Sequence, residues 1–276
     1  MHISREKREK VGLCYLGLGN RGMRVLTEHI LKMRDIEVVS VCDLDDDRLG
    51  KCGEIFKEAG RRIPYLTRSY LDAIDRPEVD AVVIMTGWDS HISIALEAMK
   101  AGKYTAMEVG CAYELSECFD LVDAYERYGA PLMMLENCCY GRRELMALNM
   151  VKQGLFGKIV HAEGGYRHDL MDRELIGKDG RGGYRTAEYL YRNCENYPTH
   201  ELGPISKILG INRGNRFMTL ASFASASRRA KQLCGVRGFR QGDIITTVIT
   251  CAGGQTVRLT LDTTLPRPHY SRDFST

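Results

Sequence analysis

The order of apolar and polar positions divides the chain into two parts. In the first part, short apolar runs alternate with stretches of helical spacing. The expected strands cover residues 11–16, 37–42, 80–86, 104–108 and 131–135, and the expected helices cover 21–34, 45–59, 90–101 and 114–128. Apolar strands that alternate with helices are typical of parallel sheets built from right-handed βαβ units. We therefore predict an α/β fold that opens with a parallel sheet, which the glycine motif described below makes a Rossmann doubly wound sheet.

The second part has a different pattern. An expected helix over residues 142–153 leads into the segment 158–166 and a glycine-rich loop, 177–183. Beyond them, three runs alternate between apolar and polar positions: 217–224, 244–251 and 256–261. The glycine pair at residues 253–254 between the last two runs is typical of a hairpin turn. We predict an α+β domain with an open, mostly antiparallel sheet, and place the two domains at residues 1–138 and 139–276.

Composition narrows the class of protein. The 276 residues carry a balanced net charge of +3, without the clustered basic face of a nucleic-acid-binding protein. No apolar run reaches the roughly 18 residues that span a bilayer. The ten cysteines lie in apolar runs or side by side and form no CxxC pair, which indicates reduced thiols and no zinc site. We expect a cytoplasmic protein with no nucleic-acid or membrane partner and no bound metal.

A glycine motif follows the first expected strand. Gly17, Gly19 and Gly22 fit GxGxxG between a strand and a helix, where the backbone and the helix N-terminus can hold a pyrophosphate. Asn20 and Arg21 belong to the same turn. Asp43 ends the second strand, where a carboxylate can accept hydrogen bonds from ribose hydroxyls and repel a 2′-phosphate. The motif predicts NAD as the cofactor; a purely structural glycine turn is the alternative.

The motifs taken together resemble the Gfo/Idh/MocA oxidoreductases, and more narrowly the NAD-dependent α-N-acetylgalactosaminidases of glycoside hydrolase family 109. The resemblance rests on the glycine motif, the segment 86–91, the Glu108 segment, and the segments 133–140, 148–157, 165–169 and 196–204. Two departures stand out. Most of the superfamily has Glu-Lys-Pro where this chain has Glu108, Val109 and Gly110, and relatives continue for about another hundred residues. The open sheet is therefore expected to be incomplete.

The resemblance implies an unusual hydrolysis. Tightly held NAD⁺ takes hydride from C3 of the sugar, a base removes the acidified C2 proton, the aglycone leaves, water adds, and the hydride returns. Tyr140 is the implied base, and His200 would polarise or deprotonate the C3 hydroxyl. Packing at a domain junction is the alternative for Tyr140, and a satisfied core position is the alternative for His200.

Further residues follow from matching positions. We expect Thr86, Trp88, His91, Glu108 and Asn137 near the cofactor, with Glu108 at the nicotinamide ribose. A salt bridge is the alternative for Glu108, and N-capping by Asp89 or Ser90 is the alternative at the start of the helix that His91 begins.

The remaining expected site residues concern the substrate. Glu136, Tyr166 and His168 are expected to contact the sugar, although surface positions are as compatible with the pattern for the last two. Arg181 and Arg185 flank a glycine-rich loop and could recognise an anionic substrate, although a solvated loop is more usual.

Three functions stay open at this point. The first is a redox-cycled glycoside hydrolase acting on a small carbohydrate or glycoside. The second is an NAD-dependent sugar or cyclitol dehydrogenase. In it, His200 would take over the proton relay to the substrate hydroxyl that the resemblance assigns to the lysine of Glu-Lys-Pro. The third is a non-catalytic NAD-binding paralogue. In each case we expect a homo-oligomer.

Overall fold

The computed structural model describes residues 9–110, 112–171, 175, 184–229, 239–266 and 270–275, with the side chain of 184 and those of 270–275 left aside. The chain forms two compact units, Met1–Leu135 and Glu136–Thr276. The sequence pattern predicts the boundary between residues 138 and 139, three residues further along the chain. Each unit contains one sheet.

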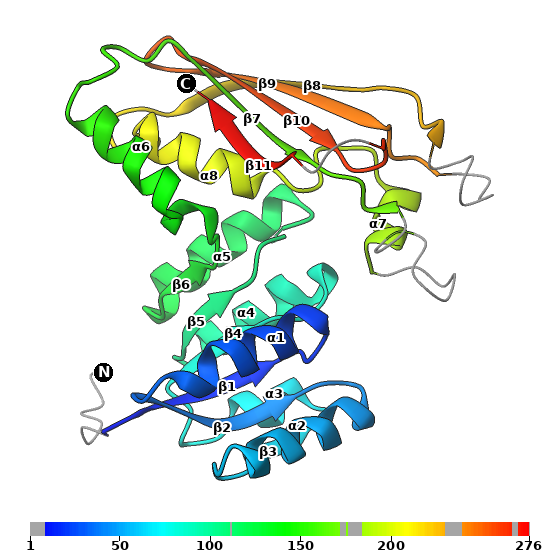
Figure 1. Ribbon diagram of the computed structural model, residues 1–276. Coiled ribbons are helices and arrows are strands. Elements are labelled where there is room, and N and C mark those ends of the chain that lie inside the picture. The colour runs from blue at the N-terminus through cyan, green and yellow to red at the C-terminus, as the bar shows by residue number, and fades with distance from the viewer. Residues whose placement is uncertain are drawn as a thin grey trace. The chain divides into compact units, whose positions relative to one another are not determined.

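The first unit contains a parallel sheet of six strands in the order β3-β2-β1-β4-β5-β6 (Figure 1). Its strands are β1 (Val11–Leu16), β2 (Ile36–Cys42), β3 (Tyr65–Thr67), β4 (Ala81–Ile84), β5 (Tyr104–Met107) and β6 (Leu132–Met134). The strand order reverses between β1 and β4, and this is the Rossmann doubly wound topology expected from the sequence. Ligands of such sheets bind beyond the carboxyl ends of the strands at this reversal.

Helices cover both faces of the first sheet. They are α1 (Asn20–Glu28), α2 (Asp46–Glu58), α3 (Tyr70–Ile74), α4 (His91–Lys100) and α5 (Leu115–Tyr128). Leu26 of α1 and Phe56 of α2 pack on one face, while Ile74 of α3 and Ala95 of α4 pack on the other. Amphipathic helices on both sides explain why the central strands are apolar throughout.

The first helix is shorter than expected. The helix predicted over residues 21–34 ends at Glu28 and continues as a separate 3-10 turn, Ile30–Lys32. Short elements β3 and α3 were also absent from the sequence-based prediction, because a strand of three residues and a helix of five are too short to show a period.

The second unit contains five strands in the order β11-β7-β10-β9-β8. They are β7 (His161–Arg167), β8 (Phe217–Ala224), β9 (Ile244–Cys251), β10 (Thr256–Asp262) and β11 (Tyr270–Ser275). Three of the neighbouring pairs are antiparallel and β7–β10 is parallel, so the sheet is mixed but mostly antiparallel, as expected. The hairpin between β9 and β10 is confirmed, with Gly254 at φ +85° in its turn.

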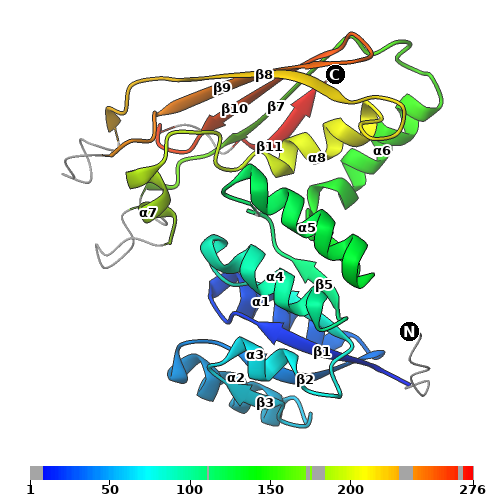
Figure 2. The ribbon, with the colours of Figure 1, turned by 180° about the vertical axis from the view of Figure 1, so that it is seen from behind.

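Helices α6 (Arg142–Lys152) and α8 (Thr199–Ile208) lie against one face of this sheet in both views (Figures 1 and 2). Ile205 of α8 packs with Val257 and Leu259 of β10 in the core beneath them. Helix α7 (Tyr184–Tyr191) was not expected from the sequence. Within the described part of the chain, no helix is long and apolar enough to cross a membrane.

Candidate functional site

The glycine motif forms a tight turn between β1 and α1. Gly17 has φ +96°, and a Cβ there would lie 2.6 Å from the Met85 carbonyl oxygen, so this position requires glycine. A Cβ on Gly22 would overlap the Gly17 carbonyl, which explains why α1 can approach the strand so closely. Gly19 has no atom within 4 Å of a built Cβ, and no side chain caps α1. An open turn at an uncapped helix N-terminus fits a pyrophosphate.

Asp43 lies directly beside this turn. One carboxylate oxygen accepts a hydrogen bond from the Leu18 amide at 2.5 Å, and the other accepts one from the Asp45 amide at 3.0 Å. The Arg48 guanidinium is 3.7 Å from the same carboxylate. The charge is thus fixed at the end of β2, where it can also meet ribose hydroxyls, because each carboxylate oxygen has more than one acceptor site.

Arg21 and Glu108 form an ion pair across the carboxyl edge of the first sheet, with Nε and Oε2 3.2 Å apart. The other Glu108 oxygen accepts from the Val109 amide at 2.9 Å. The salt bridge named as the alternative for Glu108 is therefore present. Its contact with the nicotinamide ribose stays a prediction, as does the role of Asn20 at the first position of α1.

The loop after β4 contains three expected cofactor residues. His91 begins α4 with no exposed surface, and its Nε2 lies 3.0 Å from the Thr86 carbonyl oxygen. Burial lowers the pKa of His91 although that hydrogen bond acts to raise it, so the neutral ring supports the loop. Ser90 donates to the Thr86 hydroxyl at 2.8 Å and makes no capping hydrogen bond with α4. The capping alternative is thus not observed for Ser90.

Trp88, the only tryptophan of the chain, is buried against Gly110. Gly110 has φ +88°, which proline cannot adopt, and a Cβ there would overlap the indole nitrogen. Val109 is buried, with 1% of its surface exposed. Of the two residues that replace Lys-Pro in this segment, Gly110 lies directly against the indole and Val109 is an apolar buried residue.

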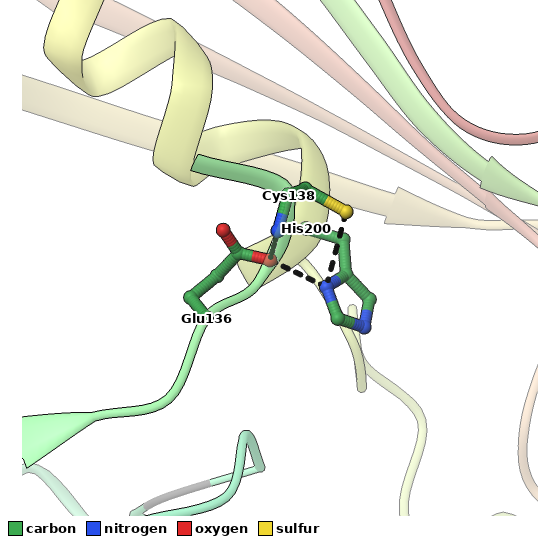
Figure 3. A group of neighbouring side chains, drawn as sticks. All are labelled: Glu136, Cys138 and His200. Carbon is green, nitrogen blue, oxygen red and sulfur yellow. Dashed lines mark hydrogen bonds and ion pairs between the residues drawn. The ribbon is translucent and has the colours of Figure 1, made fainter. Parts of the chain in front are cut away.

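The second unit brings Glu136, Cys138 and His200 together (Figure 3). Glu136 begins the unit, Cys138 begins the 3-10 turn Cys138–Tyr140, and His200 lies in the first turn of α8. The Glu136 carboxylate oxygen Oε1 is 2.6 Å from His200 Nδ1, and the Cys138 sulfur is 3.6 Å from the same nitrogen. All three side chains are buried.

The charge on Glu136 determines which ring nitrogen of His200 carries the proton. Burial alone would raise the pKa of Glu136, but hydrogen bonds from His200 and from the amides of Cys138 and Cys139 outweigh it and hold the pKa below its ordinary value. An ionised carboxylate can only accept, so His200 Nδ1 carries the proton and donates it. In the neutral ring, Nε2 is then the nitrogen that can take up a proton.

Aromatic rings surround His200. The Tyr197 ring meets it edge-on at 4.9 Å between centroids, and the Tyr166 ring stacks on it at 6.0 Å. The Arg185 guanidinium lies 4.8 Å above the Tyr197 ring, and the edge of His168 contacts Tyr166 at 4.2 Å.

Burial decides between the positions that the sequence left open for the residues around His200. Tyr166 and His168 are buried rather than on the surface, and they share one face as expected. Arg185 is buried on α7 rather than in a solvated loop. Arg181 lies outside the described residues.

Tyr140 is far more open than its buried neighbours Glu136 and His200. It is 58% exposed at the end of the 3-10 turn, and the Lys207 ammonium of α8 lies 4.3 Å from its ring centroid. Asn137, directly before that turn, is exposed, and its carbonyl accepts from the Tyr140 amide at 3.1 Å. Their catalytic and cofactor roles stay predictions.

Sequence reasoning missed Cys138, Tyr197 and Lys207. A usable signal existed for Tyr197, which lies just before α8 and only three residues from His200, within the segment 196–204 that carries the resemblance. Cys138 and His200 are 62 residues apart, so nothing in their spacing indicated a contact.

Comparison with known protein families gives one match for each half of the chain. Residues 11–136 match the oxidoreductase family with an NAD-binding Rossmann fold, and residues 140–276 match the glycosyl hydrolase 109 C-terminal domain. The chain belongs to the Gfo/Idh/MocA superfamily, in its glycosyl hydrolase 109 branch.

Two curated relatives illustrate the match of this glycosyl hydrolase 109 chain. A glycosyl hydrolase family 109 protein of Stenotrophomonas maltophilia is 35% identical over 96% of the chain and 65% of its own length. An α-N-acetylgalactosaminidase of Tannerella forsythia is 36% identical over 94% of the chain and 62% of its own length. The chain thus spans less than two thirds of the length of these relatives.

Solved structures confirm the fold of this glycosyl hydrolase 109 chain. Myo-inositol 2-dehydrogenase from Lactobacillus plantarum superposes with a TM-score of 0.72 at 18% identity, over 94% of this chain and 71% of that one. Myo-inositol dehydrogenase from Lactobacillus casei, solved with NAD(H) and myo-inositol, gives 0.70 at 15% identity, over 92% of this chain and 68% of that one.

Proposed function

We propose that this protein is an NAD-dependent glycoside hydrolase that acts on an α-linked sugar of the N-acetylgalactosamine type. The proposal rests on the glycosyl hydrolase 109 match of the second half and on the name of the Tannerella forsythia relative. One observation of the structure carries it: His200 Nδ1 lies 2.6 Å from the buried Glu136 carboxylate, whose pKa is held below its ordinary value, so the ring donates its Nδ1 proton to that carboxylate. This bond leaves Nε2 as a general base.

The first unit supplies the residues that fit NAD. Gly17, Gly19 and Gly22 would hold the pyrophosphate at the start of α1, and Asp43 would accept the ribose hydroxyls. When bound, NAD⁺ would supply a hydride acceptor that returns the hydride, so no net oxidation would occur.

The second unit supplies the groups that act on the sugar. His200 Nε2 takes the proton of a sugar hydroxyl, and Glu136 stabilises the resulting imidazolium because its charge lies at the opposite nitrogen. Tyr140 is the proposed base for the carbon-bound proton, with the Lys207 ammonium over its ring. The rings of Tyr166 and Tyr197 pack against His200 and each other, and so hold the imidazole in place.

Buried Val109 favours His200 as the proton acceptor. The superfamily lysine would offer an ammonium group at this position, whereas Val109 offers none. A simple NAD-dependent dehydrogenase that uses the histidine in this way is the alternative. The two functions differ in whether NADH accumulates.

The test is a panel of nitrophenyl α- and β-glycosides with added NAD⁺, in which phenolate release and NADH absorbance are recorded together. Release of phenolate without NADH is expected for the α-linked N-acetylgalactosaminide. NADH formed in proportion to free sugars or cyclitols would identify a dehydrogenase. Folded protein that binds NAD⁺ but gives neither signal would identify a non-catalytic paralogue.

The variant His200→Asn tests the role of the ring. It should lower the rate by about 10²- to 10⁴-fold, the usual contribution of a general base. The matched control is His161→Asn, because His161 is an exposed histidine of the same unit that hydrogen-bonds Thr256. An unchanged rate in His200→Asn would refute the assignment.

A further inference from the structure

We propose that Glu136, Cys138 and His200 form a binding site for a soft divalent cation, with Zn²⁺ as the best match. Among the residues that the structure describes, these side chains bring one carboxylate oxygen, one sulfur and one imidazole nitrogen to within 4.8 Å of one another. The three labelled side chains point toward one another (Figure 3). Three protein ligands and one water complete a tetrahedral zinc site.

The spacing of the softest pair already fits the metal. Zinc–nitrogen and zinc–sulfur bonds of about 2.0 and 2.3 Å at a tetrahedral angle put the two ligand atoms about 3.5 Å apart. The Cys138 sulfur lies 3.6 Å from His200 Nδ1. The Glu136 oxygen, at 2.6 Å from that nitrogen, would have to move away by roughly 0.8 Å to reach its place in the same polyhedron.

The donor set selects the kind of metal. A thiolate and an imidazole favour Zn²⁺ and similar borderline or soft ions, whereas Mg²⁺ and Ca²⁺ prefer sites built from oxygen. Glu136 is already oriented by the amides of Cys138 and Cys139, at 2.9 and 2.7 Å. Such outer hydrogen bonds fix a ligating carboxylate in metal sites.

The same geometry argues against a Cys–His nucleophilic pair. Both the carboxylate and the sulfur approach His200 at Nδ1, whereas a relay needs the acid at one ring nitrogen and the nucleophile at the other. A shared approach to one nitrogen is the arrangement that a single ion can replace.

Metal binding would block the base. The ion displaces the Cys138 S–H proton, which is released, and takes the Nδ1 position of His200, whose proton moves to Nε2. His200 then has no nitrogen that can accept a proton. This inhibition rests on the proposed function, while binding itself does not.

Titration of the reduced, metal-free protein with Co²⁺ under anaerobic conditions tests the site. We expect one equivalent to produce a sulfur-to-cobalt charge-transfer band and the visible bands of tetrahedral cobalt, and Zn²⁺ to abolish both. Cys138→Ser should lose the charge-transfer band and bind Zn²⁺ about a hundredfold more weakly in competition with a chromophoric chelator. Cys118→Ser, which changes an exposed cysteine of the other unit, should match the wild type.

Absence of the bands in folded wild-type protein, or their persistence in Cys138→Ser, would overturn the site. Circular dichroism checks folding, and Glu136→Gln, which keeps the thiol, gives a second variant in which the Zn²⁺ affinity must also fall. The glycosidase assay is separate: bound metal without inhibition would refute the role of His200 and leave the site standing.

Discussion

Gly110 is the residue that determines the position of the only tryptophan. Its backbone has φ +88°, and any side chain would overlap the Trp88 indole. Because Trp88 is a buried residue of the loop that the resemblance places at the cofactor, the glycine acts on the loop through the indole.

The variant Gly110→Ala should push the indole toward water. We expect a loss of stability of about 1–3 kcal/mol, from backbone strain and overlap together, and a shift of the Trp88 emission to longer wavelength. The matched control is Gly102→Ala, since Gly102 also has a positive φ, +70°, but no atom within 4 Å of its built Cβ. The control should lose some stability and keep its emission. Identical spectra in the two variants would contradict the packing of Trp88 on Gly110.

Glu136 makes stability depend on pH. Despite burial, its hydrogen bonds with His200 and two backbone amides hold its pKa below the ordinary 4.5. A group with a lowered folded pKa contributes stability above its unfolded pKa, and this contribution is lost as the pH falls through the folded value. The wild type should therefore lose this contribution below about pH 4.5.

The variant Glu136→Gln should be less stable by about 2–3 kcal/mol at pH 7, because charge-assisted hydrogen bonds to a buried group are lost. Its stability should also vary less between pH 5 and pH 3, roughly the range of carboxylate titration. Urea unfolding at several pH values measures both effects. Glu163→Gln is the control, since the pKa of Glu163 is also lowered but the side chain is at the surface. If the stability of the wild type and of Glu136→Gln fell equally between pH 5 and pH 3, roughly the range of carboxylate titration, the ionised state of Glu136 would be contradicted.

At the scale of elements, α8 depends on a glycine for its approach to the Cys138–Tyr140 turn. A Cβ on Gly203 would lie 2.8 Å from the Cys139 sulfur and 3.2 Å from the Glu136 carboxylate. The helix therefore needs a position without a side chain in order to bring His200 to Glu136.

Two glycine-to-alanine changes in helices should change the stability of the protein in opposite directions. Gly203→Ala should lower stability and, with the Glu136 carboxylate displaced, glycosidase activity. Gly50→Ala in α2, where a built Cβ meets nothing within 4 Å, should raise stability by about 0.5–1 kcal/mol because alanine is the better helix former. Thermal unfolding and the phenolate assay measure the two effects. Stabilisation by Gly203→Ala would show that α8 has room at this position.

The elements themselves were largely predictable, for a physical reason. Buried parallel strands such as Val11–Leu16 are continuous apolar runs, and Phe217–Ala224 and Ile244–Cys251 fell on their expected bounds. The parallel pairing of β7 with β10 could not be predicted from the sequence. Residues 161 and 256 are far apart in the chain, and parallel and antiparallel pairing give the same alternation of apolar and polar positions. The sequence could predict the site only where its residues form a local motif, as in the glycine turn. The contact of Glu136 with His200 depends on how α8 docks.

At the scale of the whole molecule, all of the expected cofactor residues except Asn137 belong to the same compact unit as the tryptophan, Met1–Leu135. A ligand that binds only the folded state stabilises it by about 2.7 kcal/mol at a hundred times its dissociation constant. Unfolding followed by Trp88 emission therefore reports on NAD binding directly. Saturating NAD⁺ should raise the unfolding midpoint of this unit.

NADP⁺ should raise that midpoint less, because the Asp43 carboxylate, fixed by the amides of Leu18 and Asp45, lies where the 2′-phosphate would have to fit. Asp43→Asn removes the charge and leaves Arg48 paired with Asp45 alone, at 3.4 Å, so the difference between the two cofactors should narrow by about tenfold in affinity. Asp47→Asn, an exposed acid in the first turn of α2, is the control and should keep the preference for NAD⁺. Equal stabilisation of the wild type by NAD⁺ and NADP⁺ would show that Asp43 does not select the cofactor, and the preference would then have to come from residues outside the β2–α2 turn.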